Sequence, residues 1–329
     1  MTETRQPLTV ADLTPLARAA LGPHRTPTAV TQLRGGSKKG VYRLALDDGT
    51  TAIAYVWSPE ESYWDRPDTD IRDTFSHASG LGLFLSAHHR LTELGVRTPR
   101  LYLADEDAVH LPAHAALVED IPGGSLEELL RRDPAAARAP LAGLAEALAV
   151  LRECTATGHG KAVLVEEGGM PFGDSCEQVV ADRAVTDIAE IAERDSRARV
   201  ARQALSARVR ELRAAVEPRR HTSLVHGELG PDHVLVTPDG TPALIDIEGL
   251  IYFDAEWEHV FLRLRFGSHY DALRVEDLDP ARMELYRLAL HLNLVAGPLR
   301  LLDGDFPFTE SMREIAEHNL ARALELVTP

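Results

Sequence analysis

The residues best suited to chemistry lie in one stretch, LVHGELGPDHVLV, at 224–236. It holds His226, Glu228, Asp232 and His233 within a few positions of one another. Imidazole and carboxylate groups can bind a metal ion or exchange protons with a substrate. The glycines and the proline between them disfavour a helix, and the Val-Leu-Val that follows is typical of a strand. The stretch therefore predicts a loop that presents polar side chains where a strand begins.

Three metal-dependent chemistries match parts of this pattern. A zinc deaminase starts with His-x-Glu but needs a later Pro-Cys-x-x-Cys, and no cysteine follows Cys176. A metalloprotease needs His-Glu-x-x-His on a helix, which the spacing and the glycines exclude. An iron site with two histidines and a carboxylate, completed by His259, His269 or His291, stays as an alternative, although the chain is mainly helical after residue 122.

A hairpin explains the pattern better. The Val-Leu-Val is followed by a Thr-Pro-Asp-Gly turn and a second apolar run that ends in Asp246. Counting equally back from the turn pairs Val236 with Thr241, which places Asp246 beside His233, at the start of the first strand. Glu228 lies in the loop before that strand. Phosphoryl transfer uses two carboxylates in this way, one to orient the attacking hydroxyl and one to hold the metal on the nucleotide phosphates.

The elements that must position these groups change in type along the chain. Residues 1–121 contain short strands (AVTQL, VYRLAL, TAIAYVW, RLYLA and AALVEDI) and a helix expected at about 75–94. Residues 122–329 are mainly helical, with a Ser125 capping box and an Asp279-Pro280 helix start. The sequence predicts an α+β fold with a strand-rich N-lobe and a helical C-lobe that contains the loop at 224–249.

Composition narrows the partners. The chain has 329 residues, 44% hydrophobic and 26% charged, with a formal net charge of −16. This acidic balance argues against binding to nucleic acid, which needs a basic surface. No apolar run is long enough to cross a membrane, no signal peptide is visible, and two cysteines give no disulfide framework. We expect a cytoplasmic protein without a membrane partner.

The motifs resemble those of the aminoglycoside phosphotransferase family, a branch of the bilobal protein-kinase-like fold that includes choline, homoserine and methylthioribose kinases. That family carries His-Gly-Asp-Leu-x-x-x-Asn followed by three apolar residues, a turn and an Ile-Asp. HGELGPDHVLV and LIDIEG stand in those places. LRGGSKKGVYRLAL resembles the glycine-rich loop, ALVEDIPGGSLEELL the hinge, and YFDAEWEHVFL the Gly-Asp-Pro-x-x-Asp-Leu segment. The resemblance covers about residues 27–265.

The resemblance implies an ATP-dependent phosphotransferase that acts on a hydroxyl of a small molecule. Glu228 would orient or deprotonate the acceptor, His226 would support its loop, and Asp246 with His233 would hold Mg²⁺. Backbone groups at Glu119 to Ile121 would hold the adenine, and helices after residue 250 would form the acceptor pocket. GGSKKG is no Walker A motif, since Val and Tyr follow it, but the resemblance implies that it covers the phosphates with Gly35, Gly36, Ser37, Lys38, Lys39 and Gly40.

The chain departs from the family at the two polar positions of this loop. Glu228 replaces an aspartate and is longer by one methylene, which shifts the geometry of a base. His233 replaces an asparagine, and imidazole is a poor ligand for Mg²⁺ and a better one for Mn²⁺. Glu248 is either a second acidic contact or a surface charge, and Asp232 either caps the loop or lies near the metal. The acidic run Asp254, Glu256 and Glu258 is typical of a solvated helix start.

A third departure concerns the third strand. The family carries a phosphate-contacting lysine there, but TAIAYVW has Tyr55 at about that position, and Phe84 lies near the place of the lysine's glutamate partner. We expect Lys38 or Lys39 to supply the missing charge from the glycine-rich loop. These departures leave two alternatives: a catalytically silent kinase-like protein that binds nucleotide or a partner, and an enzyme with a protein or peptide acceptor.

Overall fold

The structure, a computed structural model, describes residues 5–33, 36–64 and 69–327. Contacts divide the chain into two compact units. The N-terminal unit contains Met1–Pro67, His77–Gly143 and Asp232–Glu248, and the C-terminal unit contains Asp68–Ser76, Leu144–Pro231 and Gly249–Pro329. These units group residues by their contacts and are not defined as lobes. The lobe boundary expected between residues 121 and 122 therefore stays a prediction. Gly35 lies outside the described residues.

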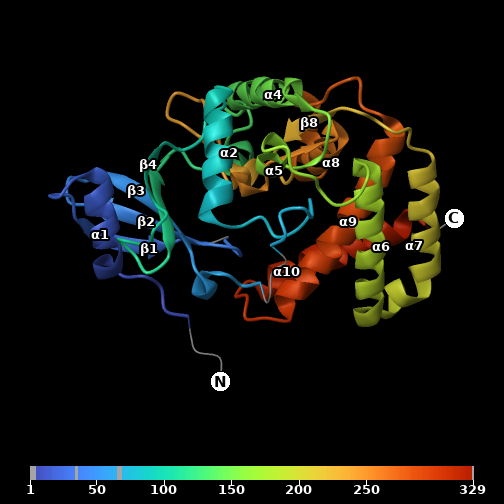
Figure 1. Cartoon of the computed structure of the whole chain (residues 1–329), viewed down its shortest axis with the longest axis horizontal. Helices are drawn as coiled ribbons and strands as arrows, with labels where there is room; N and C mark the ends of the chain where they lie inside the picture. The colour runs from blue at the N-terminus through green and yellow to red at the C-terminus, as the bar shows by residue number, and fades with distance from the viewer. Residues whose placement is uncertain (1–4, 34–35, 65–68, 328–329) are drawn as a thin grey trace. The chain divides into compact units, whose positions relative to one another are not determined.

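The N-terminal unit is built on an antiparallel sheet with the order β1-β2-β3-β5-β4 (Figure 1). The hairpin between β2 and β3 turns at Gly49, whose φ of 82° suits glycine. Strand residues with alternating burial face a core that includes Tyr42, Leu44 and Leu117. The strands are β1 (Pro27–Gln32), β2 (Gly40–Leu46), β3 (Thr51–Trp57), β4 (Leu101–Asp105) and β5 (His114–Glu119).

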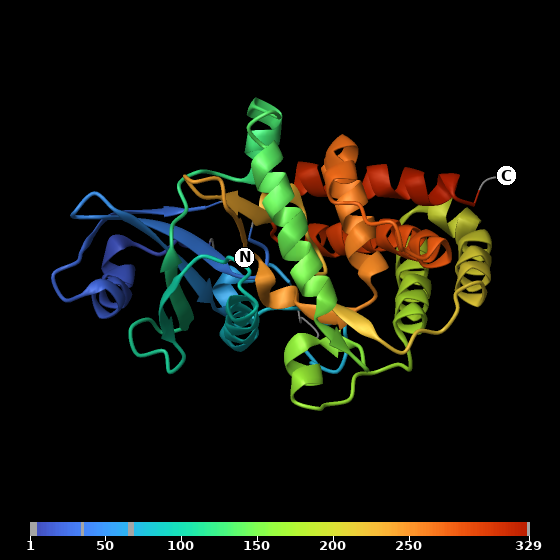
Figure 2. The same ribbon diagram turned by 90° about the horizontal axis from the view of Figure 1, so that it is seen from above.

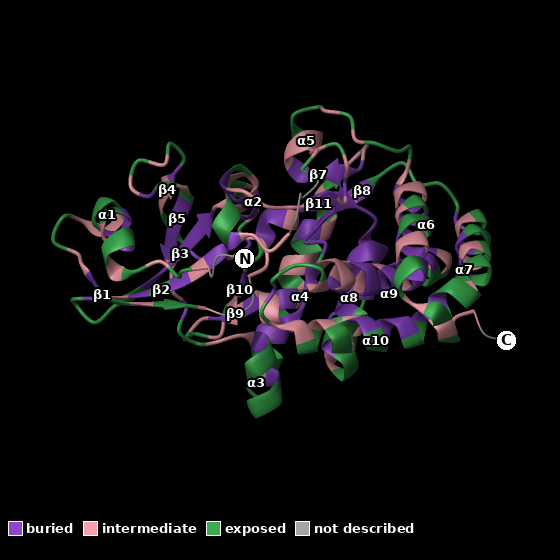
Figure 3. Cartoon of the chain, turned by 90° about the horizontal axis from the view of Figure 1, so that it is seen from below, coloured by how far each residue is buried: buried purple, intermediate pink, exposed green. Residues whose placement is uncertain are grey.

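Two helices pack on this sheet. Helix α1 (Val10–Leu21) begins at a Thr9 capping box and buries Leu13 and Leu16 against the strands. Figure 3 shows the buried residues of β3 and β5 in purple and the outer side of α1 in green. Helix α2 (Leu81–Glu93) starts six residues later than the sequence indicated. Gly80 precedes it with a φ of 121°, which is not helical, so the predicted start at residue 75 was wrong.

A short helix and a second hairpin complete the unit. Helix α3 (Leu126–Arg132) starts at the predicted Ser125 capping box. Strand β9 (Val234–Val236) follows a 3₁₀ turn at Pro231–His233 and pairs with β10 (Pro242–Leu244). The observed register joins Val236 to Pro242, one residue away from the predicted Val236–Thr241 pair. Thr237 explains the shift, because its N–H and hydroxyl both donate to the Thr241 carbonyl and close a longer turn.

The C-terminal unit joins helices to a small sheet that the sequence did not indicate, with the order β6-β8-β11-β7. In Figure 2, α6 and α7 lie side by side, and α9 packs against α6 and α10. Helix α9 starts at Asp279, whose side chain accepts from two backbone N–H groups, as predicted. The elements are α4 (Arg138–Glu153, which contains the division at residue 143), β6 (Thr155–Ala156), β7 (Gly160–Lys161), α5 (Ala162–Glu166), α6 (Cys176–Arg194), α7 (Ser196–Ala214), β8 (Thr222–Val225), β11 (Ile251–Phe253), α8 (Ala255–Phe266), α9 (Pro280–Leu302) and α10 (Thr309–Glu325).

The core of this unit is aromatic around the start of α8. Phe253, Trp257 and Tyr286 contact one another with ring centroids 5.8–6.2 Å apart. Burial of large apolar side chains is the main stabilising contribution to such a core. No helix within the described ranges is both long and apolar enough to span a bilayer.

Candidate active site

The N-terminal unit contains a charged cluster centred on Lys39. Its Nζ donates to Asp246 Oδ1 at 2.9 Å and to Glu248 Oε1 at 2.5 Å. The Lys39 side chain is only 9% exposed. Burial alone lowers the pKa of a lysine, but the charges of Asp246 and Glu248 outweigh it and raise the pKa of Lys39. Lys39 is therefore a fixed positive charge at neutral pH.

Asp246 combines strain, exposure and charge. Its φ is 58°, in the left-handed region, where a residue other than glycine costs about 1–3 kcal/mol and is enriched at functional sites. Its side chain is 41% exposed, whereas that of Glu248 is 4% exposed. The adjacent ammonium of Lys39, more than any other group, lowers the pKa of Asp246. The outcome is an ionised carboxylate that is held in place and open to a ligand.

His233 lies beside Asp246, as predicted from the hairpin. Its Nε2 is 3.8 Å from Asp246 Oδ2 and 3.7 Å from Asp232 Oδ2, and its side chain is about one-fifth exposed. The one-residue shift in register keeps this neighbourhood, because the Ile245 N–H donates to the His233 carbonyl and brings the strand end alongside. Two candidate ligands of one metal site are therefore close in space.

The glycine-rich loop is fixed at several points. Ser37 accepts from the Trp64 indole N–H at 3.1 Å and, through its carbonyl, from the Tyr63 N–H at 2.9 Å. The Ser79 hydroxyl donates to the Lys38 carbonyl at 3.1 Å. Gly40 leaves no room for a side chain, since a Cβ there would lie 2.5 Å from Glu61 Oε2. Gly36 begins the described part of this loop.

The third strand has an aromatic cluster where the family resemblance placed a lysine. The ring of Tyr55 packs edge-on against Trp57 and Phe84, with centroids 6.1 and 5.6 Å apart. Lys39 Nζ lies 5.2 Å from the centroid of the Tyr55 ring. Burial raises the pKa of Tyr55 to about 12, so the phenol stays neutral. Aromatic rings thus fill the space where the third-strand lysine was expected, and the positive charge beside them is that of Lys39 from the glycine-rich loop.

The candidate hinge follows β5. Glu119 pairs with Ala52 of β3 and donates its N–H to the Arg100 carbonyl at 2.8 Å. Burial opposes ionisation, but hydrogen bonds from Arg97 and the Arg100 N–H prevail and lower the pKa of Glu119. Ile121 is 3% exposed. These contacts fix the chain where backbone groups were predicted to hold an adenine, a role that stays a prediction.

The first part of the predicted loop, residues 224–231 with His226 and Glu228, belongs to the C-terminal unit. His226 is 1% exposed, Glu228 is exposed, and the Gly227 N–H between them donates to Glu258 Oε2 at 3.1 Å. Burial raises the pKa of Glu258. The loop thus directs its one carboxylate to solvent while a buried carboxylate holds its backbone. Whether Glu228 meets Asp246 stays a prediction, since the two belong to different units.

The acidic run at the start of α8 is not solvated, so that prediction was wrong. Asp254, Glu256 and Glu258 are 1%, 1% and 3% exposed. The Arg282 guanidinium donates to Asp254, and Arg219 Nη1 donates to Glu256 at 2.8 Å. Every residue of the first half of α8 is buried, so this half has no solvent face on which acidic side chains would lie.

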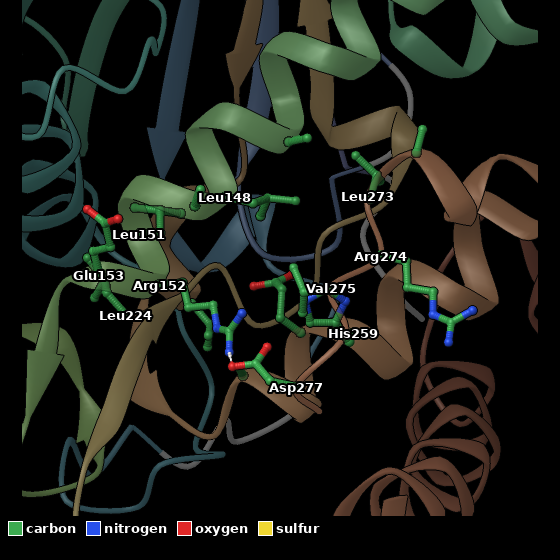
Figure 4. A pocket seen from close by; sticks show the side chains of 16 residues that line it. Leu148, Leu151, Arg152, Glu153, Leu224, His259, Leu273, Arg274, Val275 and Asp277 are labelled. Atoms are coloured by element: carbon green, nitrogen blue, oxygen red, sulfur yellow. Dashed lines mark hydrogen bonds and ion pairs between the residues drawn. The ribbon is translucent and has the colours of Figure 1, made fainter. Parts of the chain in front are cut away.

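A cavity of about 370 Å³ lies within the C-terminal unit (Figure 4). In Figure 4 the side chains of Arg152 and Asp277 point toward each other and form an ion pair. His259 is 5% exposed, and burial lowers its pKa to about 4. The lining is mainly apolar and comes from Ala145, Leu148, Ala149, Leu151, Arg152, Glu153, Leu224, Val225, Ala255, Glu258, His259, Ala272, Leu273, Arg274, Val275 and Asp277. Glu228 is not among the residues that line this cavity. The cavity is therefore not assigned as the acceptor pocket, whose position stays a prediction.

Comparison with known sequences decides the family. The model of the phosphotransferase enzyme family (APH) matches residues 29–286, far more than half of the chain. The chain belongs to this family. No curated protein matches the sequence of this phosphotransferase at a significant level.

Solved structures share the fold of this family member at low identity. The choline kinase LicA from Streptococcus pneumoniae is 14% identical, with a TM-score of 0.62 over 96% of this chain and 97% of that one. The GDP and kanamycin complex of APH(2")-IIia is 18% identical, with a TM-score of 0.59 over 93% and 98%. A complex of APH(4)-Ia with ADP and hygromycin B is 14% identical, with a TM-score of 0.56 over 90% and 94%. The predicted α+β fold, with a sheet-rich N-terminal region and a helical C-terminal region, is confirmed.

The cluster around Asp246 suits a hard divalent cation that also binds phosphate. Within the described ranges no three His, Cys, Asp or Glu side chains gather as a metal cage. Mg²⁺ in phosphotransferases does not need one, because one or two carboxylates suffice beside phosphate oxygens and water. Glu248 Oε2 is buried without a hydrogen-bond partner among the described residues. A second carboxylate is thus placed with Asp246 on the same ammonium, and of the two interpretations of Glu248 the structure excludes a surface charge, since its side chain is 4% exposed.

Sequence reasoning missed two supporting groups of this phosphotransferase, Glu258 and Arg282. The sequence predicted a solvated surface for Glu258, because runs of acidic residues are usually exposed to solvent. The apolar and aromatic residues between its acidic neighbours in YFDAEWEHVFL leave no polar face, which is the signal of a fully buried helix. For Arg282 the sequence offers only a position after the Asp279 cap, and nothing there indicates burial.

Proposed function

We propose that this phosphotransferase moves the γ-phosphoryl group of a nucleoside triphosphate, ATP in the first place, to a hydroxyl of a small molecule. The observation that carries the proposal is the pairing of an exposed, strained Asp246 with a buried Lys39 from a glycine-rich loop. Opposite charges arranged in this way suit a metal-bound polyphosphate. The ADP and GDP complexes of similar structures support a nucleotide donor.

The residues of this chain divide the work. Asp246, with Glu248 or His233, would hold Mg²⁺ or Mn²⁺, and the metal would neutralise charge on the phosphates. Glu228 accepts the proton of the acceptor hydroxyl, and the oxygen of that hydroxyl forms a bond to the γ-phosphorus. The bond from the γ-phosphorus to the bridging oxygen breaks, and the nucleoside diphosphate leaves with that electron pair. Ser37 and Gly40 hold the loop that covers the phosphates.

A silent nucleotide-binding protein is the second candidate. It is favoured by His233, which gives the metal site an imidazole where the family has an asparagine. The same fold would then bind nucleotide, or a partner protein, without transferring phosphate. The two candidates differ in turnover and agree in binding, which makes them separable.

The test is turnover with two donors, two metals and a panel of acceptors. ATP or GTP is mixed with Mg²⁺ or Mn²⁺ and with an acceptor. The acceptors are choline, kanamycin, hygromycin B and further small alcohols, since the similar structures are a choline kinase and complexes with kanamycin or hygromycin B. We expect equal amounts of nucleoside diphosphate and phosphorylated acceptor, and none from Asp246→Asn. Nucleotide-induced thermal stabilisation without product supports the silent candidate. A protein that is neither stabilised nor active contradicts both.

A further inference from the structure

Lysine is rare in this chain, and its placement is selective. The sequence has 35 lysines and arginines, and only Lys38, Lys39 and Lys161 are lysines. Two of the three are adjacent in the glycine-rich loop. The ammonium of Lys39 is a compact point charge on a flexible stem, and it donates to both Asp246 and Glu248.

The ammonium of Lys39 lies above the third strand. Lys39 precedes Gly40, which pairs with Val56, so its side chain starts beside β3. Its Nζ ends over the ring of Tyr55. A lysine that started at position 55 would reach the same neighbourhood from the strand itself. The charge is therefore where a third-strand lysine would place it, although it comes from the loop.

The pairing of Lys39 is also complete. Glu248, which is 4% exposed, holds the ammonium at 2.5 Å, and Asp246, which is 41% exposed, takes the side open to a ligand. The loop backbone is fixed by Ser79 on Lys38 and by Tyr63 on Ser37. A charge that is buried, held by two carboxylates and mounted on a fixed loop is preorganised to meet phosphate at little entropic cost.

We infer that Lys39 is the phosphate-binding lysine of this enzyme, displaced from the third strand to the glycine-rich loop, with Glu248 as the residue that positions it. This inference rests on the proposed function, because it assumes a nucleotide whose phosphates lie next to Asp246. It assigns different roles to two adjacent lysines: Lys39 contacts phosphate, and Lys38 adds only a long-range positive charge near Asp246.

The test compares ADP with adenosine by calorimetry, because only ADP carries phosphates. Lys39→Ala should weaken ADP binding about tenfold or more, the cost of one charge-assisted hydrogen bond, and leave adenosine binding unchanged. Lys38→Ala should weaken it much less. Arg25→Ala, which removes an exposed charge that pairs with Asp48 in the same unit, is the control for net charge. A purely structural role for Lys39 would lower the melting temperature and affect both ligands alike.

Moving the lysine back gives the decisive variant. Lys39→Ala combined with Tyr55→Lys should recover most of the lost ADP affinity, because the ammonium returns from the strand. Wild-type affinity for ADP in Lys39→Ala, or no recovery in a folded double variant, overturns the assignment of Lys39. Wild type that binds neither ADP nor ATP overturns the proposed function and this inference together.

Discussion

Lys39 Nζ lies 2.9 Å from Asp246 Oδ1, although 207 residues separate the two in sequence. This ion pair joins the glycine-rich loop to the end of the β9–β10 hairpin within one compact unit. The partners are unequal, since Lys39 is buried and Asp246 is open to solvent. Because of this difference in exposure, one face of the Asp246 carboxylate is open to a ligand. The predictions for the site follow from this open face.

Asp246→Asn should abolish metal-dependent turnover with little loss of fold. The change removes the charge that would hold the metal, an effect worth several kcal/mol, so kcat/KM should fall at least about a hundredfold. Lys39 keeps Glu248 as a partner, which limits the structural damage. Kinetics and a melting curve on the same sample check both parts, and unchanged kcat/KM would exclude Asp246 from the metal site.

Glu228→Gln should lower kcat by about 10²–10⁴ and leave nucleotide affinity unchanged, because it removes a base without touching the N-terminal unit. Glu228→Asp should keep part of the turnover, since the carboxylate stays and only its reach changes. Steady-state kinetics and nucleotide titration of both variants give the comparison. Full turnover by the glutamine variant would show that Glu228 is not the base.

The buried His259 should make the protein sensitive to acid. Its pKa is lowered by burial to about 4, below the ordinary value near 6.5, so the unfolded chain binds a proton first as the pH falls. Its contribution to stability is therefore present above about pH 6.5 and is lost between there and pH 4, by up to about 3 kcal/mol. His259→Gln should flatten the pH dependence of the unfolding free energy. His89→Gln, at a side chain 77% exposed, is the control and should not.

Arg282→Met should destabilise the C-terminal unit strongly. Arg282 is 1% exposed and donates to Asp254, so its removal leaves this buried carboxylate with only the more distant Arg219, 3.6 Å away, as a counter-charge, at a cost of about 3–5 kcal/mol. Tyr286 also donates to Asp254 and offsets part of this cost. Urea unfolding against Arg322→Met, at an exposed arginine, measures the difference. Equal unfolding midpoints would contradict the assigned role of the ion pair.

The sequence predicted most elements because their signals are local. The strands of the N-terminal sheet, the Ser125 capping box and the Asp279 helix start all follow from neighbouring residues. The late start of α2 and the shifted β9–β10 register depend on Gly80 and on the side chain of Thr237, whose conformations the pattern alone does not fix. The small sheet of β6, β7, β8 and β11 was missed because its strands are only two to four residues long.

The sequence motif predicted which residues of the candidate site are neighbours, but it did not predict which of them are buried. His233 and Asp246 are neighbours, as the hairpin indicated, and the expected loop lysine is found at the carboxylates. The sequence did not distinguish Lys38 from Lys39 as the source of the charge, because the direction and burial of a side chain depend on tertiary packing. Burial of Asp254 and Glu256 likewise depends on arginines elsewhere in the chain, Arg282 and Arg219, and burial of Glu258 on the Gly227 N–H.

The central claim is that Asp246 holds a metal-bound nucleotide, and calorimetry of ADP with and without Mg²⁺ tests it most directly. Wild type should bind ADP more tightly with Mg²⁺ than with a chelator, and Asp246→Asn should bind equally weakly in both. A nucleotide affinity that does not depend on the metal in wild type, or a metal dependence that survives in Asp246→Asn, would contradict the account.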